Sequence, residues 1–184
     1  MADKQAEARS VSSMRATAHP VRLQILSLLT GADMSAAEIA RELDITHANA
    51  SYHLRFLAGT GLVVEAGEEK IRGGVAKRYR HPWDAELKDP KATAEDRGLY
   101  VRAMAEELVR RATLRKSRTP TRLTDAELWV TPETWKQVQS LVEEASQLVH
   151  AEAKPPRTPG TLHVNMTAAT FEMDDSPTSH TGDA

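Results

Sequence analysis

The chain has 184 residues, enough for one domain of ordinary size or two small ones. Only 4% of the residues are aromatic, so leucine, valine, isoleucine and alanine must form most of the core. The lack of cysteine excludes disulfides, thiolate metal ligands and a cysteine nucleophile. No apolar run approaches 18 residues, and the start MADKQAEARS is polar. We therefore expect a cytoplasmic protein without a transmembrane helix.

The net charge of −2 conceals an asymmetry along the chain. Residues 1–83 hold eleven basic and nine acidic residues, whereas the rest holds thirteen basic and seventeen acidic residues. A near-neutral total therefore does not exclude a nucleic-acid partner, because the placement of charge matters more than its sum.

The first predicted helix follows a tail, residues 1–10, that we expect to be disordered, and a weakly helical stretch at 10–18. His19-Pro20 suits a helix start, because proline in the first helical position loses no hydrogen bond that the helix needs. Gly31 is a plausible end. Apolar residues between these limits recur at helical spacing: Val21, Ile25, Leu28 and Leu29.

Two short helices are predicted next. Ser35-Ala-Ala-Glu38 has the pattern of a capping box, in which serine and glutamate side chains bind each other's backbone amides. Thr46 is the predicted cap of the helix that follows, which ends at Gly59 to Gly61. The predicted buried faces consist of Ile39, Ala40 and Leu43 in the first helix and Ala50, Leu54 and Leu57 in the second.

A β-hairpin is predicted after these helices. Residues 62–66 and 75–81 read as strands, and the glycine-rich residues 67–74 read as the turn. The tip and the returning arm carry five basic residues with no acid among them: Lys70, Arg72, Lys77, Arg78 and Arg80.

Helix, short turn, helix and basic hairpin is the order of a winged helix-turn-helix, whose second helix lies in the major groove of DNA. No carboxylate occurs between Ile45 and Val64. That absence suits a surface that contacts a polyanion. Asparagine can pair with adenine and arginine with guanine, while serine, threonine and histidine can donate to bases or phosphates.

Helical geometry divides the second helix into faces. At 100° per residue, Asn49 and Tyr52 point away from the inner face, and Ser51 and Arg55 lie on its flanks. His53 falls between inner-face residues, so a partly buried structural role is favoured for it over DNA contact.

Three segments resemble the ArsR-type winged helix regulators of bacteria: MRATAHPVRLQILSLL, SAAEIARELDITHANASYHLRFLAGTGLVVE and GGVAKRYR. The resemblance covers roughly residues 12–82 and implies a homodimeric, nucleoid-associated regulator that binds a palindromic operator in double-stranded DNA. It also implies a response to a metal, small molecule or stress signal. The residues that it assigns to DNA reading are Thr46, His47, Asn49, Ser51, Tyr52 and Arg55, and its wing contacts are Lys70, Arg72, Lys77 and Arg78.

The chain departs from the metal-sensing members of that family. It has no cysteine, and its long helices lack a His-x-x-His or His-x-x-Glu pair that would bring two ligands to one face. We therefore expect no metal site and no cofactor. We also expect no enzyme, since no paired-carboxylate motif or phosphate-binding glycine loop is present.

The second half predicts two long helices and two short strands. A linker at 83–94 precedes a helix over 95–116, with Tyr100, Met104 and Leu108 in steps of four. Residues 128–130 read as a strand, a helix starts at Thr131-Pro132, and residues 162–166 alternate as a strand that extends toward Met173. The tail from residue 174 has the composition of a disordered segment. The apolar stripe of the second helix is Trp135, Val138, Leu141, Val142, Ala145, Leu148 and Val149.

We therefore expect a mainly α-helical protein with a β-hairpin wing. A winged helix-turn-helix at 11–82 precedes a dimerisation and candidate effector region at 95–173, which includes a small α/β appendage. The helix over 95–116 is expected in a dimer interface, with packing inside one chain as the alternative. For the tryptophans Trp129 and Trp135, a core position is favoured over a pocket. The basic run from Arg110 to Arg122 is read as a solvated helix end rather than as further phosphate contacts.

A repressor is the preferred function. The alternative is a winged-helix module that docks proteins and does not bind a specific operator.

Overall fold

The computed structural model describes residues 12–84 and 92–174. The tails predicted at 1–10 and 174–184, apart from Asp174, lie outside the described residues, as does most of the linker predicted at 83–94.

Four helices form the N-terminal half, and their ends follow from local capping. They are α2 (Ser13–Thr17), α3 (Pro20–Gly31), α4 (Ala36–Leu43) and α5 (His47–Gly59). The predicted limits of α3 and the capping box of α4 are confirmed. His19 caps α3 with a ring nitrogen, Nδ1, that accepts from the backbone amide of Val21 at 3.2 Å. Asp44 ends α4 in the left-handed conformation, at φ 52°.

The helices enclose one apolar core. The predicted inner face of α5 is fully buried, with Ala50, Leu54 and Leu57 at most 1% exposed. Ile25 and Leu29 from α3 and Ile39 from α4 meet it. Leu62 and Val63, which the sequence assigns to a strand, close the core from the loop before the wing. Burial of these side chains is what fixes the orientation of α5.

A three-stranded antiparallel sheet forms the wing. The strands are β1 (Met34–Ser35), β2 (Val64–Ile71) and β3 (Gly74–Arg80), in the order β1-β3-β2. The long turn predicted at 67–74 is wrong, because β2 continues through a bulge between Glu65 and Gly67 and only Arg72-Gly73 joins the strands. Gly67 has φ 145°, which a side chain would oppose, so the glycine marks the bulge and not the turn.

Helix α6 (Ala94–Thr113) packs across α2 and α3. The helix predicted at 95–116 is confirmed, but its predicted inner stripe is only partly correct. Tyr100 and Met104 are half-buried, whereas Leu108 is exposed. Two acids take the buried positions instead. Asp96 accepts from Ser12 and Arg15, and Glu107 accepts from Gln24, Arg110 and Arg111.

The C-terminal half differs most from the prediction. The second long helix is confirmed as α7 (Pro132–Ala151), but none of its residues is buried. The strands predicted at 128–130 and 162–166 do not form, because these extended segments have no neighbouring strand in the described part of the chain. Trp129 is 86% exposed, so it occupies neither a core nor a pocket, while Trp135 is half-buried.

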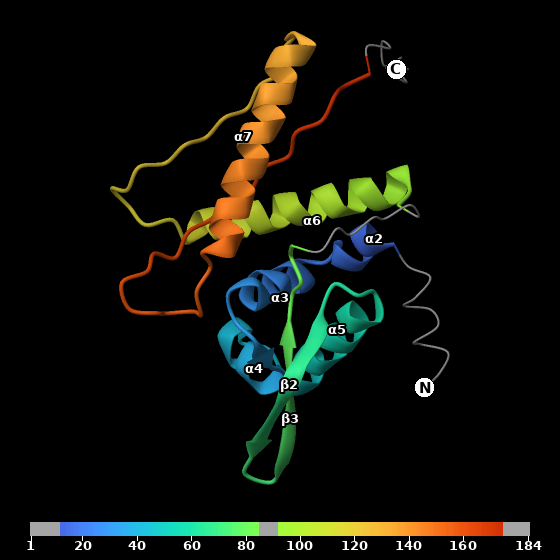
Figure 1. Ribbon diagram of the computed structural model, residues 1–184, viewed down its shortest axis with the longest axis vertical. Coiled ribbons are helices and arrows are strands. Elements are labelled where there is room, and N and C mark those ends of the chain that lie inside the picture. The colour runs from blue at the N-terminus through green and yellow to red at the C-terminus, as the bar shows by residue number, and fades with distance from the viewer. Residues whose placement is uncertain (1–11, 85–91, 175–184) are drawn as a thin grey trace, which may run out of the picture.

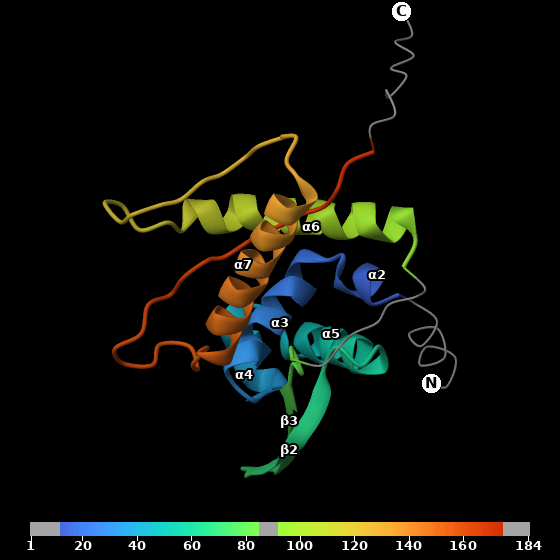
Figure 2. The same cartoon turned by 45° about the horizontal axis from the view of Figure 1, so that its top comes forward.

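The wing and α7 lie at opposite ends of the molecule (Figure 1). In Figure 1, helix α6 runs between the helix-turn-helix and most of α7, and in the tilted view of Figure 2 helix α7 crosses α6. The N-terminal half therefore presents α5 and the wing on the side away from α6 and α7.

Candidate nucleic-acid interface

Helix α5 begins at an exposed, well-capped end. The hydroxyl oxygen of Thr46 accepts from the backbone amide of Asn49 at 3.2 Å, as the sequence predicts. The remaining amides of the first turn have no partner within the helix and form a positive end that attracts phosphate. Since the first turn carries no acidic side chain, nothing within it neutralises that end.

The structure places nearly all residues predicted to read DNA on one solvent-facing side of α5 and its N-cap. Tyr52 is 54% exposed, and Ser51 is half-buried beside the wing. The other exposed members are Thr46, His47, Asn49 and Arg55. Exposure is a condition for base contact, which stays a prediction for each of these side chains.

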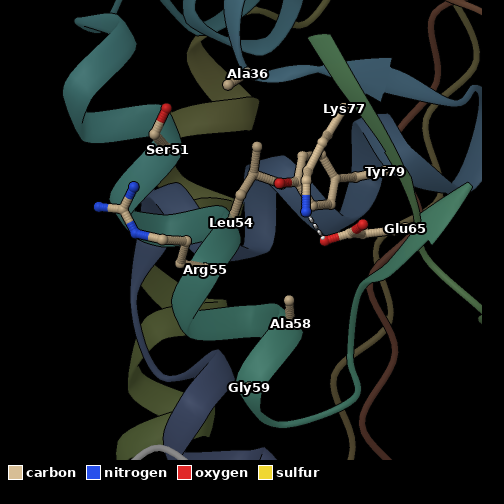
Figure 3. A pocket seen from close by; sticks show the side chains of 9 residues that line it. All are labelled: Ala36, Ser51, Leu54, Arg55, Ala58, Gly59, Glu65, Lys77 and Tyr79. Atoms are coloured by element: carbon tan, nitrogen blue, oxygen red, sulfur yellow. Dashed lines mark hydrogen bonds and ion pairs between the residues drawn. The ribbon is translucent and has the colours of Figure 1, made fainter. Parts of the chain in front are cut away.

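A cleft of about 450 Å³ separates α5 from the root of the wing. Ser51 and Arg55 border it on the helix side, and Glu65, Lys77 and Tyr79 border it on the strand side (Figure 3). Small residues at its lower end, Ala58 and Gly59, keep it open. One flank of α5 and the base of the wing therefore line the same concave surface.

The wing does not present all its cations freely. The ammonium group of Lys77 binds Glu65 at 2.7 Å, and this hydrogen bond raises the pKa of Lys77 (Figure 3). Sequence analysis missed these acids because Glu65, Glu68 and Glu69 lie on the first strand, away from the basic run. Had the turn been assigned to the two residues Arg72-Gly73, the strand register would have followed, and with it the position of the β2 acids beside the basic strand, with Glu68 opposite Lys77.

Arg78 ties the wing to the helix-turn-helix. Its guanidinium donates to Glu69 at 2.6 Å, to Glu38 at 3.2 Å and to the carbonyl of Asp33. Burial alone would raise the pKa of the Glu38 carboxyl, but hydrogen bonds from Ser35 and the charge of Arg78 hold it below the usual range. The cations of the wing that have no ion pair within the described residues are Lys70, Arg72 and Arg80. Arg80 belongs to the predicted basic run but not to the wing contacts that the family resemblance implies.

We expect Arg78→Ala to lower the free energy of unfolding by about 1–3 kcal/mol, because it leaves three acceptors without their donor. Arg72→Ala, an exposed residue at the tip of the same hairpin, should change it by less than about 0.5 kcal/mol. Urea unfolding of the two variants checks this. Equal stability would contradict a structural role for Arg78.

A compact aromatic cluster supports α5 from behind. His53 is 6% exposed, its ring lies 4.9 Å from that of His19, and its Nδ1 atom has no hydrogen-bond partner within the described residues. Burial and the nearby His19 and Arg22 lower the pKa of His53 to about 4. Arg22 in turn stacks on Phe56, 4.5 Å from the ring centre. The structural role predicted for His53 agrees with this burial.

Across the described residues, no three histidine, aspartate or glutamate side chains gather in a way that would hold a metal ion. In the same part of the chain, no helix combines the length and apolarity needed to cross a bilayer.

Residues 17–66 match the family model of a helix-turn-helix domain. The match runs from the end of α2 into β2 and includes all of α5. A comparison with curated proteins finds no match to the chain. The chain therefore carries a helix-turn-helix domain, followed by a wing and two long helices.

Proposed function

We propose that this protein is a DNA-binding transcriptional regulator of the ArsR type, acting as a repressor. The observation that carries the proposal is the exposed side of α5, which lacks any carboxylate and begins at a capped, positive N-terminus. Side chains on that face match the donors that read base edges, asparagine and arginine above all.

The wing supports the same proposal. Lys70 and Arg72 are exposed at the tip of the β2–β3 hairpin. That hairpin points away from α6 and α7 (Figure 1). A duplex docked on α5 would bring its backbone toward that tip, and each phosphate contact adds affinity that does not depend on sequence. Lys77 and Arg78 contribute to phosphate binding only if they loosen their ion pairs with glutamate.

We infer that the active form is a homodimer. A two-fold axis on the α6 and α7 side would leave both recognition helices free and set them about 34 Å apart, the length of one turn of B-DNA. The operator is then a palindrome with half-sites at that spacing. A small molecule or stress signal that alters the dimer would alter this spacing and hence the affinity.

Selection of genomic fragments by the purified full-length protein, followed by sequencing, tests the proposal. The expected result is a palindromic site whose half-site centres lie about 10 base pairs apart. Affinity for that site, measured by fluorescence anisotropy, should fall steeply between about 50 and 200 mM salt. Failure to enrich any sequence, with no binding even at low salt, would overturn the proposal. The sign of regulation follows from transcription of the bound genes when the protein is removed.

One observation favours the alternative, a winged-helix module that docks proteins: two of the wing cations are already paired with glutamates. Charge reversal at Lys70 and Arg72 separates the two functions. If the wing binds DNA, the variant should bind the selected site more weakly than the wild type. If the protein is a docking module, the wild type selects no DNA site at all.

A further inference from the structure

The C-terminal half exposes far more apolar surface than the helix-turn-helix. Of the nineteen large apolar side chains that are exposed within the described residues, sixteen lie between Val101 and Met173. Exposed apolar patches of a few hundred Å² are unusual on a monomer and mark an interaction surface.

Two extended segments account for much of this surface. Leu162, Val164 and Met166 alternate with polar residues, and two further exposed apolar residues, Phe171 and Met173, follow in the same segment but out of phase with that alternation. A second apolar segment runs from Leu128 to Val130. Within the described residues, no backbone hydrogen bond involves 123–130 or 162–173. Residues 162–166 thus have the side-chain period of a strand, and both segments lack a partner strand that would satisfy their amides.

Helices α6 and α7 add apolar stripes at helical spacing. In α7, Val138, Leu141, Ala145 and Leu148 are exposed at steps of three, four and three, the spacing of a helix that packs on another helix. In α6, the exposed stripe is Val101, Ala105, Leu108 and Ala112, opposite the face that packs on α2 and α3. The two helices that carry these stripes lie on the side of the molecule away from the tip of the wing (Figure 1).

Within residues 12–84 and 92–174, the chain leaves this surface uncovered. The segments at 123–130 and 162–173 run apart from each other, and the termini of the described chain provide no strand between them (Figures 1 and 2). A large apolar side chain offers roughly 100 Å² of apolar surface when it is fully exposed. Sixteen of them exceed the roughly 800 Å² per partner that a stable interface needs.

The charges of the same region complement each other, which favours a second copy of the chain over an unrelated partner. The run from Arg110 to Arg122 holds six basic residues and no acid, whereas residues 125–152 hold six acids and one lysine. Among the described residues, no ion pair joins the two groups within one chain. In a dimer with a two-fold axis, the acidic residues of each copy would face the basic run of its partner.

We propose that a second copy of this chain covers this surface, with segments 123–130 and 162–173 forming strands of a sheet that neither copy can build alone. The α7 helices of both copies then cover one face of that sheet. The proposal specifies the interface of the proposed homodimer and does not depend on DNA binding.

The sharpest test uses neighbouring residues on opposite faces of one segment. Val164→Glu places a charge on the apolar face, and His163→Glu places the same charge on the other face. Both side chains are exposed in the single chain, so neither change disturbs its core. Light scattering after gel filtration should give about twice 20.3 kDa for the wild type and for His163→Glu. Val164→Glu should raise the dimer dissociation constant by at least roughly 100-fold, because a buried, unpaired charge is costly.

Hydrogen exchange supplies a second readout on the unmodified protein. The amides of 162–173 should exchange slowly in the wild type at micromolar concentration and fast on dilution, since the partner protects them. A monomeric wild type, or a dimer in which these amides exchange freely, would overturn the proposal. A protected dimer that selects no DNA sequence would uphold this interface while overturning the proposed function.

Discussion

Arg55→Glu should lower the affinity for the selected operator by at least roughly 100-fold, because it removes a cation from the reading face and adds a charge that phosphate repels. Arg55 is exposed on α5 and borders the cleft between that helix and the wing. Its surroundings on α5 contain no carboxylate that the new glutamate would join. Anisotropy titration of the labelled operator measures the loss.

Arg55→Ala separates base reading from repulsion. This variant should lose about 1–3 kcal/mol of binding free energy for the preferred site. The slope of the logarithm of the binding constant against the logarithm of the salt concentration should become shallower by about one. Lys136→Glu is the matched charge reversal and should leave the affinity unchanged, because Lys136 is an exposed residue of α7, a helix that lies at the opposite end of the molecule from the wing (Figure 1). If the Arg55 and Lys136 variants bind equally well, α5 is not the reading helix.

The protein should lose about 3 kcal/mol of stability between pH 6.5 and pH 4 because of His53 alone. Its pKa is about 4 in the folded protein, against 6.5 for the unfolded side chain. Over that range, His53 binds a proton more readily in the unfolded chain than in the folded one, so the free energy of unfolding falls as the pH falls. Above about pH 7.5 this side chain is neutral in both states, and its contribution to stability no longer changes.

His53→Leu tests the assignment. The Nδ1 atom of His53 has no hydrogen-bond partner within the described residues, so an apolar side chain of similar size loses no bond there. In this variant, the free energy of unfolding should fall less steeply with decreasing pH, by an amount that corresponds to about one proton fewer taken up on unfolding. Urea unfolding from pH 7 to pH 4.5 measures this slope. His47→Gln, an exposed histidine of the same helix, should keep the wild-type slope. An unchanged slope in His53→Leu would assign the acid sensitivity to other groups, such as His19 or His81, whose pKa values burial also lowers.

Much of the helix-turn-helix was predictable from local rules. The caps at His19, Ser35 and Thr46 involve residues two or three positions apart, so a short stretch of sequence defines each helix start. The inner face of α5 follows from apolar spacing, since burial of Ala50, Leu54 and Leu57 fixes which side faces out. The exposure of Asn49 and Arg55 is a consequence of that same periodicity.

The charge state of the wing was not predictable by the same means. The basic run of the hairpin is visible in the sequence, but its pairing with Glu65 and Glu69 depends on strand register. Arg78 also binds Glu38, which lies forty positions away and comes close only when β3 packs beside α4. From the sequence alone these cations look unpaired, whereas in the folded hairpin two of them, Lys77 and Arg78, form ion pairs with glutamates.

The sequence by itself determined the order of the elements, the starts of the helices and the acid-free face of α5, because each depends on neighbours within one or two turns. Three features depend on the three-dimensional packing: which cations of the wing are paired, the burial of Asp96 and Glu107 in α6, and the lack of a partner strand for residues 128–130 and 162–166 within the described part of the chain. The physical reason is the same throughout: hydrogen bonds and ion pairs between distant segments depend on register and packing, which no local pattern encodes.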